Sequence, residues 1–425
     1  MIKILNSENV TKEEILCRVQ APDNVAPAVD AVIANVKENG DKAIIEYAKL
    51  FDKADIDCVE VSQEEIQQAM ESVDEKFIQI IKQASDNIRD FHKRQIRGDF
   101  VSNSRKGVVL GQKVIPLSRV GLYVPGGTAS YPSTVLMNCI PAKLANVGQI
   151  IMATPPKSDG KIPSVILAAA HIAGVDKVFK MGGAQAIAAM AYGTESVPAV
   201  DKIVGPGNIY VATAKAKVRG ICDIDMIAGP SEILVVADKN SDPELVAADM
   251  LSQAEHDKLA AAILITDSMD LARKVENELE RQIAELPRNE IAAASIEDHG
   301  RIIVTESIEK AVQIANMIAP EHLELCVDDP FAILDLVKNA GSVFLGRNTP
   351  ESVGDYFAGT NHTLPTSGTA RFSSPLSVDD FVKTTQFIYY SEQALMTEGE
   401  SIAYFAEKEG LSAHARAVTK RMEKK

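Results

Sequence analysis

The chain has 425 residues, of which 46% are hydrophobic and 24% charged, a composition typical of a folded globular protein with room for more than one domain. Its 44 basic and 59 acidic side chains give a net charge of −15 at pH 7, which opposes binding to nucleic-acid phosphates and to anionic lipid. No apolar stretch approaches the ~20 residues that cross a bilayer, and the beginning of the chain does not resemble a signal peptide. We therefore expect a cytoplasmic protein that binds neither nucleic acid nor membranes.

The cysteines are odd in number and scattered, and no two of them form a CxxC pair. This pattern argues against a disulfide framework and against a zinc site made of thiolates. We expect most of them to be small buried hydrophobic residues. The five are Cys17, Cys58, Cys139, Cys222 and Cys326.

The N-terminal region predicts helices. Residues 26–50 have helical apolar spacing, and Ser62 with Glu65 forms a capping box that predicts one long helix running towards Ile96. From residue 120 onward, short apolar runs alternate with helical stretches, which is typical of βαβ units and a parallel sheet. The first cycle predicts strands at 120–124, 149–153, 177–181 and 202–204, and helices at 133–145, 164–173 and 184–192.

A second cycle of the same kind follows. It predicts strands at 232–237, 261–266, 301–304, 323–327 and 342–345, and helices at 243–256, 270–285, 308–318 and 331–338. The two cycles indicate an α/β fold with two doubly wound, Rossmann-like parallel-sheet domains. Residues 355–376 predict a long loop. Beyond it, residues 378–390 and a helical stretch at 411–420 form a tail that is too small to bury a core alone and should dock on another domain or chain.

Three pairs of polar residues could carry chemistry. Gln253 and His256 lie three apart near a helix end and could share a ligand, although a solvated helix end is the simpler interpretation. Glu321-His322 places a carboxylate and an imidazole between a helix and a strand, where the two could divide proton transfers; an ordinary connection would also explain them. Asp355 and His362 flank a loop and offer ligands suited to zinc, while a helix-terminal aspartate is the plain alternative.

Glycine-rich turns after three strands could bind an anion. They lie at 123–127, 182–185 and 204–208, each ahead of a helix whose first backbone N–H groups are free. None of them matches GxGxxG, and the acid that follows that fingerprint is missing as well. A nucleotide cofactor, if bound, is therefore held in a nonstandard way.

Several of these segments occur together, and in this order, in one family. They are RVGLYVPGG at 119–127, GPGN at 205–208, AGPSE at 228–232, QAEH at 253–256, PEHL at 320–323, GTNHTLP at 359–365 and EGLSAH at 409–414. From about residue 25 to its end, the chain resembles the histidinol dehydrogenase family. The resemblance implies a homodimeric, zinc-dependent enzyme that oxidises L-histidinol to L-histidine through the aldehyde with two NAD, the last step of histidine biosynthesis.

The resemblance also implies roles for individual residues. His322 would take the alcohol proton, and Glu321 would activate water against the aldehyde. The zinc ligands would be Gln253, His256, Asp355 and, from the partner subunit, His414. Because glutamine is an unusual zinc ligand, Glu255 or Asp257 is the alternative to Gln253. The substrate contacts would be Ser231, Gln253, His256, His322, Asp355, His362, Glu409 and His414, and the NAD contacts Tyr123, Gln185 and Asn208.

We expect four parts in the chain. Residues 1–22 form an N-terminal segment, and residues 23–111 with 230–376 form one α/β domain that carries the metal and acid–base residues. Residues 112–229 form the other α/β domain, with the NAD contacts. Residues 377–425 form the tail, which docks on the partner subunit and shares its active site.

Two other classes of protein stay open. A zinc hydrolase could use two histidines, one carboxylate and a neighbouring glutamate to activate water, although it would not need the glycine-rich strand ends. A metal-stapled binding or scaffold protein would use the same ligands without catalysis. Both alternatives predict no formation of NADH when histidinol and NAD are supplied.

Overall fold

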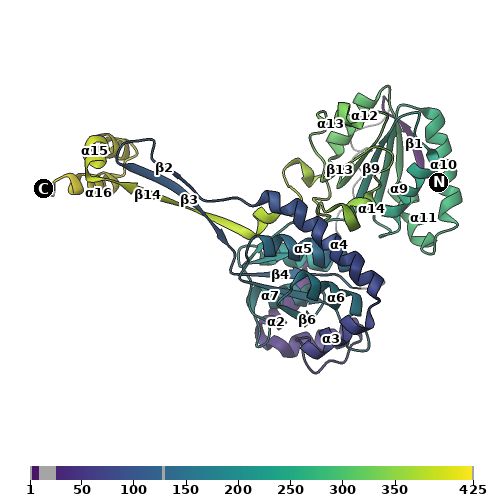
Figure 1. Ribbon diagram of the computed structural model, residues 1–425, viewed down its shortest axis with the longest axis horizontal. Coiled ribbons are helices and arrows are strands. Elements are labelled where there is room, and N and C mark those ends of the chain that lie inside the picture. The colour runs from purple at the N-terminus through teal and green to yellow at the C-terminus, as the bar shows by residue number, and fades with distance from the viewer. Residues whose placement is uncertain (1, 9–24, 127–129, 424–425) are drawn as a thin grey trace. The chain divides into compact units, whose positions relative to one another are not determined.

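The computed structural model describes residues 2–8, 25–126 and 130–423 (Figure 1). The chain divides into two compact units, one made of Met1–Gln95 and Leu117–Phe381 and the other of Ile96–Pro116 and Val382–Lys425. None of the helices in the described ranges is long and apolar enough to cross a membrane.

The first unit contains a five-stranded parallel sheet with the order β6-β5-β4-β7-β8. Its strands are β4 (Arg119–Tyr123), β5 (Gln149–Thr154), β6 (Lys177–Lys180), β7 (Lys202–Val204) and β8 (Asp223–Ile224). Its crossover helices are α5 (Pro132–Leu144), α6 (Ser164–Ala173), α7 (Gly183–Tyr192) and α8 (Ile209–Val218). The strands are buried along most of their length because helices cover both faces of a parallel sheet. The expected strands and helices of the first cycle are thus present, and α8 and β8 extend it.

The N-terminal helices belong to this five-stranded sheet. They are α2 (Val25–Tyr47), η1 (Ala48–Asp52), α3 (Gln63–Ser72), α4 (Glu75–His92) and η2 (Lys93–Gln95). α2 buries Val29, Val36 and Ile44 in the same core as Phe179 and Ile187. This grouping differs from the expected one, which joined residues 23–111 to 230–376, because the apolar face of α2 packs on α7 and α8.

The prediction of one long helix after Ser62 is wrong, because two helices follow. The capping box is present, with the Glu65 backbone N–H donating to Ser62 Oγ at 3.2 Å. The helix nevertheless ends at Ser72, and Val73 is extended. A second cap follows at once, because the side chain of Asp74 accepts from the Phe77 backbone N–H and starts α4.

The same unit contains a six-stranded parallel sheet with the order β1-β11-β10-β9-β12-β13. Its strands are β1 (Lys3–Asn6), β9 (Glu232–Ala237), β10 (Ala261–Thr266), β11 (Arg301–Val304), β12 (His322–Cys326) and β13 (Ser342–Leu345). Counted along the chain from β4 and from β9, both sheets have the strand order 3-2-1-4-5, and β1 adds an edge strand to the larger one. β1 lies within residues 1–22, for which the sequence predicts no strand; the rest of that segment lies largely outside the described residues.

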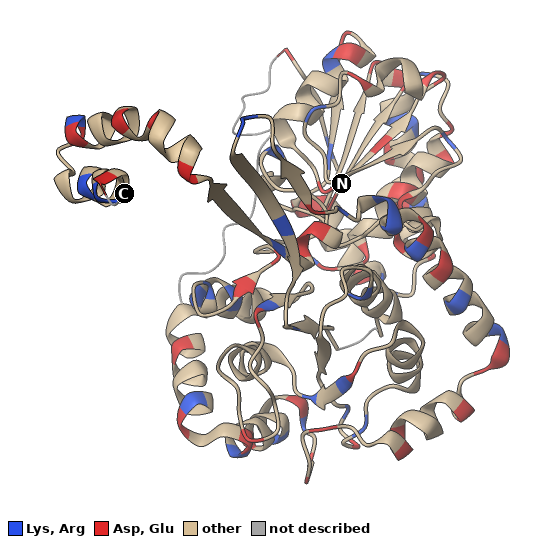
Figure 2. Cartoon of the chain, turned by 60° about the vertical axis from the view of Figure 1, so that its left-hand side comes forward, with Lys and Arg blue, Asp and Glu red and all other residues tan. Residues whose placement is uncertain are grey.

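Helices cover both faces of the larger sheet. They are α9 (Pro243–Ala254), α10 (Met269–Ile283), α11 (Asn289–Asp298), α12 (Ile308–Ile318) and α13 (Pro330–Leu334), and after β13 the chain continues through α14 (Glu351–Val353), η3 (Gly354–Ala358), η4 (Thr369–Arg371) and η5 (Val378–Phe381). The outer helices carry acidic and basic side chains in mixture (Figure 2). On α10, for example, Arg281 pairs with Glu278 and Glu285, and such solvent-screened surface pairs contribute little to stability.

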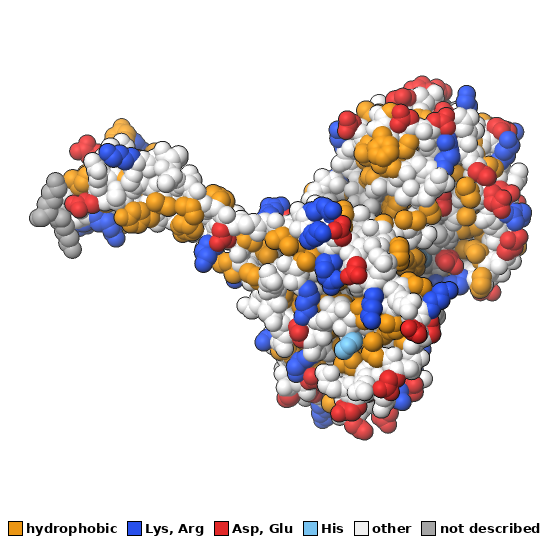
Figure 3. Space-filling view, viewed as in Figure 1, with side chains coloured by type: hydrophobic (Ala, Val, Ile, Leu, Met, Phe, Trp, Pro, Cys, Tyr) orange, Lys and Arg blue, Asp and Glu red, His pale blue; other side chains and the backbone are white. Residues whose placement is uncertain are grey.

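The second unit is an antiparallel sheet followed by two helices. Its strands are β2 (Phe100–Ser102), β3 (Val108–Pro116) and β14 (Val382–Tyr390), in the order β14-β3-β2, and its helices are α15 (Glu392–Lys408) and α16 (Ser412–Glu423). The C-terminal part is thus more than the small helical tail expected, since residues 96–116 join it through β3. The unit leaves large apolar side chains in solvent, among them Ile388 at 71% and Phe405 at 69% exposure (Figure 3).

The described cysteines are all free thiols. Cys139, Cys222 and Cys326 are buried, as expected of small hydrophobic residues, and Cys58 is exposed. Cys17 lies outside the described residues.

Candidate active site

A polar cluster lies at the amino ends of β9 and β12, which are neighbours in the larger sheet. Glu321 immediately precedes β12, and His322 is its first residue. Ser231 immediately precedes β9. Because α9 runs antiparallel to the strands, its last turn carries Gln253, and the residues just after it carry His256, to the same edge.

His322 is held with one ring nitrogen bonded and the other open. Its Nδ1 lies 3.0 Å from the carbonyl oxygen of Glu232, so Nδ1 carries the proton and Nε2 the lone pair. Nε2 lies 3.6 Å from Glu351 Oε1 and 3.8 Å from Asp355 Oδ1, and it has no hydrogen-bond partner among the described residues. Burial lowers the pKa of His322, against the opposing charge of Asp355. The result is a neutral imidazole that can accept a proton.

Glu321 lies beside this imidazole. Its Oε2 accepts a hydrogen bond from the Glu232 backbone N–H at 2.9 Å and lies 3.7 Å from His322 Nδ1. Burial raises the pKa of Glu321 well above its ordinary value, and the Glu232 hydrogen bond opposes that shift only in part. A carboxyl group with a raised pKa is a stronger base when ionised and can also return the proton that it takes up.

Gln253 is fully buried within the cluster. In the orientation that satisfies both ends of its amide, Nε2 donates to Glu351 Oε1 at 2.9 Å and Oε1 accepts from the Glu232 backbone N–H at 3.2 Å. Asp257, an alternative to Gln253, is exposed and accepts from the Leu259 backbone N–H. Glu255, the other alternative, is partly exposed at the end of α9.

Glu351 is a member of the cluster that our sequence analysis misses. Its backbone N–H donates to Glu324 Oε1 at 2.8 Å, and its Oε2 accepts from Ser252 Oγ at 3.4 Å. Burial raises the pKa of Glu351 to about 8. The signal that could have found it is its position four residues before Asp355, which places both carboxylates on one helical face.

The carboxylates and His322 could hold a cation. One ligand atom each from His322, Glu351 and Asp355 lies within 4.8 Å of the others. Burial raises the pKa of Asp355 to about 7; the charge of His322 opposes this shift, and a smaller repulsion from Glu351 adds to it. Imidazole nitrogen and carboxylate or amide oxygen are ligands that zinc accepts, and a bound cation would favour the ionised carboxylates.

Two further histidines belong to the same electrostatic neighbourhood. The side chain of His256, just after α9, is exposed in this chain, yet partial desolvation by the surrounding protein lowers its pKa, and the charge of His322 lowers it further. Burial also lowers the pKa of His362 to about 4, with smaller contributions from His322 and His256. The loop that carries His362 is fixed on α5, because the Asn361 amide donates to the Met137 carbonyl oxygen at 2.7 Å.

The remaining candidate residues lie in the second unit. Glu409 follows α15 and His414 lies in α16, and both are exposed. Among the described residues, the cluster of the first unit is assembled without them. Gln253, His256, Ser231, Glu321, His322, Asp355 and His362 are thus gathered at or near one edge of the larger sheet.

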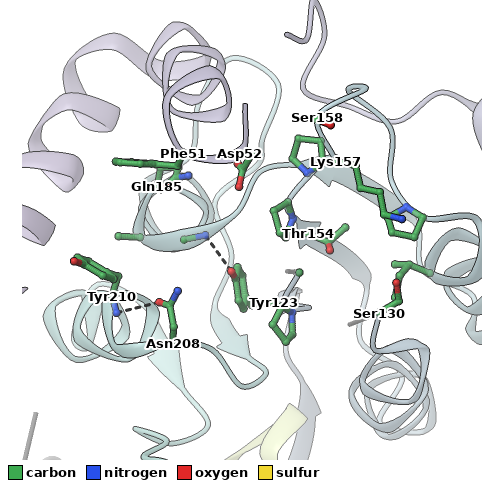
Figure 4. Close-up of a pocket in the computed structure, with 18 of the residues that line it drawn as sticks. Phe51, Asp52, Tyr123, Ser130, Thr154, Lys157, Ser158, Gln185, Asn208 and Tyr210 are labelled. Carbon is green, nitrogen blue, oxygen red and sulfur yellow. Dashed lines mark hydrogen bonds between the residues drawn. The ribbon is translucent and has the colours of Figure 1, made fainter. Parts of the chain in front are cut away.

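A separate pocket of about 860 Å³ lies at the carboxyl ends of the five-stranded sheet (Figure 4). Tyr123, Gln185 and Asn208, the three expected cofactor contacts, line it. The Tyr123 hydroxyl accepts from the Gly183 backbone N–H at 3.0 Å, and Asn208 caps α8. The pocket lies where β4 and β7 adjoin and the strand order reverses, the usual place for a ligand in such sheets.

The backbone geometry explains why the first residue of the GPGN segment is glycine. Gly205 has φ +115°, and a Cβ at this position would lie 2.1 Å from the carbonyl oxygen of Tyr123. Only glycine therefore lets β7 end this close to β4 at the floor of the pocket. Gly127, the last residue of the RVGLYVPGG segment, lies outside the described residues.

Comparison with known proteins identifies the family. A model described as histidinol dehydrogenase matches residues 17–422. Histidinol dehydrogenase of Clostridium acetobutylicum is 54% identical over 394 residues, which cover 93% of this chain and 91% of the relative. That of Geobacillus kaustophilus is 55% identical over 397 residues, covering 93% and 94%. A crystal structure of histidinol dehydrogenase from Elizabethkingia anophelis, 40% identical, has a TM-score of 0.95 over 99% of this chain and 98% of that one. The chain belongs to the histidinol dehydrogenase family.

Proposed function

We propose that this chain oxidises L-histidinol to L-histidine through L-histidinal with two NAD, as the last step of histidine biosynthesis. The observation that carries the proposal is the pairing of His322, whose Nε2 is open, with Glu321, whose carboxyl pKa is raised. An imidazole base and a carboxyl group at one sheet edge provide for two different proton transfers. Family membership adds the substrate and leaves the hydrolase and scaffold alternatives without support.

In the first half of the reaction, His322 Nε2 takes the proton of the substrate's alcohol. The hydrogen bond from Nδ1 to the Glu232 carbonyl oxygen then stabilises the imidazolium that forms. NAD, when bound, accepts the hydride in each half. In the second half, Glu321 takes a proton from water as the water oxygen attacks the aldehyde carbon. The hydrate that results is oxidised to the carboxylate, so the new oxygen of histidine comes from water.

We infer that Gln253, His256 and Asp355 hold one zinc ion per chain. His256 fits because its lowered pKa keeps the imidazole neutral and able to ligate. Asp355 fits because a cation would offset the burial that raises its pKa and its smaller repulsion with Glu351. Zinc, when bound, supplies a positive charge that can orient the amine and imidazole nitrogens of histidinol. In the orientation in which Gln253 donates to Glu351, its amide oxygen accepts from the Glu232 backbone N–H, and the second lone pair of that oxygen would be the one offered to zinc.

We further propose a cytoplasmic homodimer with shared active sites. The second unit leaves Ile388, Tyr404, Phe405 and Leu411 in solvent, at 43% to 71% exposure. Large apolar side chains exposed in this number on one small unit are typical of an interface. Docking of the second unit on a partner would bring Glu409 to the substrate and His414 to the zinc ion of the partner, completing a ligand set that one first unit supplies only in part.

The proposal is tested by counting products. Zinc-loaded protein supplied with limiting histidinol and excess NAD should form two NADH for each histidine. Formation of no NADH would support the hydrolase or scaffold alternatives. One NADH for each histidinol, with histidinal as the end product, would overturn the assignment of both half-reactions to one site.

A further inference from the structure

Asp52 is a pocket residue to which the proposed reaction gives no role. It is the last residue of η1, a π-helical turn that follows α2, and it lines the pocket of the five-stranded sheet. Its Oδ2 is buried and has no hydrogen-bond partner among the described residues. Figure 4 shows the carboxylate directed into the pocket, on the side of Tyr123 and Gln185.

A buried carboxylate oxygen without a donor is costly for the fold. Burial raises the pKa of Asp52 to about 6, which means that the ionised form is poorly compensated in the free protein. The turn that presents it is well held, since the Ala54 backbone N–H donates to the Ala48 carbonyl oxygen at 3.1 Å. π-Helical turns are often found at functional sites. A ligand that brings a hydrogen-bond donor would remove this cost.

The surroundings of Asp52 fit an adenosine. Phe51, the preceding residue, is 56% exposed and stacks on Tyr47 with ring centroids 5.4 Å apart. Ala28 and Val32 of α2 continue this apolar wall of the pocket. A planar base can lie against such a wall, and the sugar attached to it would then meet the adjacent carboxylate. Lys157, also in the lining, offers a cation for a phosphate.

The pocket also indicates which end of the dinucleotide binds here. None of the described residues that line it comes from residues 230–376, which carry His322 and Glu321. The nicotinamide must reach those two residues. The wall formed by Phe51 and Asp52 would therefore contact the adenosine end of the dinucleotide. In standard dinucleotide folds an acid after the second strand binds the adenosine ribose, whereas residues 155–158, which follow β5 here and line the pocket, contain no acid.

We propose that Asp52 accepts a hydrogen bond from the 2′-hydroxyl of the adenosine ribose of NAD and thereby selects NAD over NADP. This inference rests on the proposed function, which supplies the dinucleotide. The acid comes from the helical segment before the sheet instead of from the sheet itself. A 2′-phosphate at the same place would set two negative charges against each other, so the carboxylate disfavours NADP.

The test compares Asp52→Asn with the unchanged protein and with Asp55→Asn. Asp55 is a matched control, because it lies three residues away and its side chain is 87% exposed. Binding of NAD and of NADP to the zinc-loaded protein is measured by calorimetry without histidinol. Asp52→Asn should weaken NAD binding on the order of tenfold and narrow the preference for NAD over NADP, because a hydrogen bond to a charged group is lost. Asp55→Asn should change neither.

A stability measurement separates this role from a structural one. Since the pKa of Asp52 is raised from 3.8 to about 6 in the folded chain, its charge destabilises the fold as pH rises through that range, and fully above it. Asp52→Asn should therefore unfold at the same or a higher temperature than the unchanged protein at pH 8 without NAD. A lower unfolding temperature would mean that the carboxylate supports the fold, and would overturn the proposal.

The binding outcomes are equally decisive. Unchanged NAD affinity in Asp52→Asn would overturn the contact. An equal loss for NAD and NADP would place the carboxylate on another part of the cofactor and overturn the ribose assignment. Failure of the unchanged protein to bind any NAD would contradict the proposed function itself, so the two failures can be told apart.

Discussion

The two parallel sheets of the first unit share one strand order. Their functional residues nevertheless lie at opposite ends of the strands, the carboxyl ends in one sheet and the amino ends in the other. In the five-stranded sheet, the carboxyl ends of β4 and β7 open into the pocket lined by Tyr123 and Asn208. In the six-stranded sheet, the corresponding strands are β9 and β12, and Glu321 and His322 lie at their amino ends.

Side chains fill the space at the carboxyl ends of the strands in the larger sheet. Arg347 pairs with Asp238 and, at 2.8 Å, with Asp328, and the Asp328 backbone N–H donates to Asp238 at 2.8 Å. Ser241 Oγ donates to the Cys326 carbonyl oxygen at the end of β12. The position that forms a pocket in one sheet is therefore filled by an ion-pair network in the other. Strand order alone does not determine where a site forms, since the side chains at each edge decide it.

The largest effect is expected from Glu321→Gln, in the cluster at the amino ends of β9 and β12. Loss of the carboxyl group that activates water should slow oxidation of histidinal on the order of a hundredfold or more. Oxidation of histidinol to the aldehyde depends on His322 and should fall much less. Single-turnover measurements with each substrate would separate the two. Equal losses in both halves would contradict the division of labour between the two residues.

Mixed dimers test whether the second unit completes the cluster. His414→Ala and His322→Asn should each inactivate the homodimer. A dimer with one chain of each kind should regain about half of the normal activity, because one of its two sites then contains neither substitution. Activity is measured on mixed dimers purified by two different affinity tags. No recovery would favour a site formed within one chain.

The hydrogen bond between Glu351 and Gln253 leads to a smaller effect. Glu351→Gln should weaken zinc binding by about 10- to 100-fold, since the carboxylate orients and polarises the Gln253 amide. Competition with a chromogenic chelator reports this affinity independently of turnover. Glu244→Gln is the control, because Glu244 lies in the first turn of the same helix and its side chain is 67% exposed. Unchanged zinc affinity in Glu351→Gln would remove Glu351 from the metal site.

Substitutions at the carboxyl ends of the larger sheet's strands should lower stability without lowering catalytic activity. Arg347→Met breaks the pairs with Asp238 and Asp328 and should lower the free energy of unfolding by about 1–3 kcal/mol. The kcat and the KM for histidinol should stay within about twofold, because this network lies at the opposite edge from His322. Denaturant unfolding and steady-state kinetics check the two parts. A large fall in kcat with unchanged stability would show that this edge takes part in the reaction.

Much of the first unit could be predicted from the sequence. The limits of β7, β9, β10, β11 and β13 agree with the expected ones, because each is a short apolar run between glycine, proline or charged residues. β1 and β3 could not be predicted in this way. Each depends on pairing with a strand far away in the chain, β11 in one case and β14 in the other, and such pairing leaves no local periodicity.

The candidate site, like the fold, could be predicted from the sequence only in part. The polar pairs and the family resemblance point to His322, Gln253 and Asp355, which do lie in one cluster. They did not draw attention to Glu351 or Asp52, since the importance of these residues comes from contacts made across the fold. An unpartnered buried carboxylate becomes visible only when the residues that surround it are in place.

We infer that the cluster of the larger sheet works with one bound zinc ion per chain. Protein stripped by a chelator and titrated with zinc should regain NADH formation in proportion to bound metal, up to one ion per chain. Full NADH formation by the metal-free protein would contradict the claim.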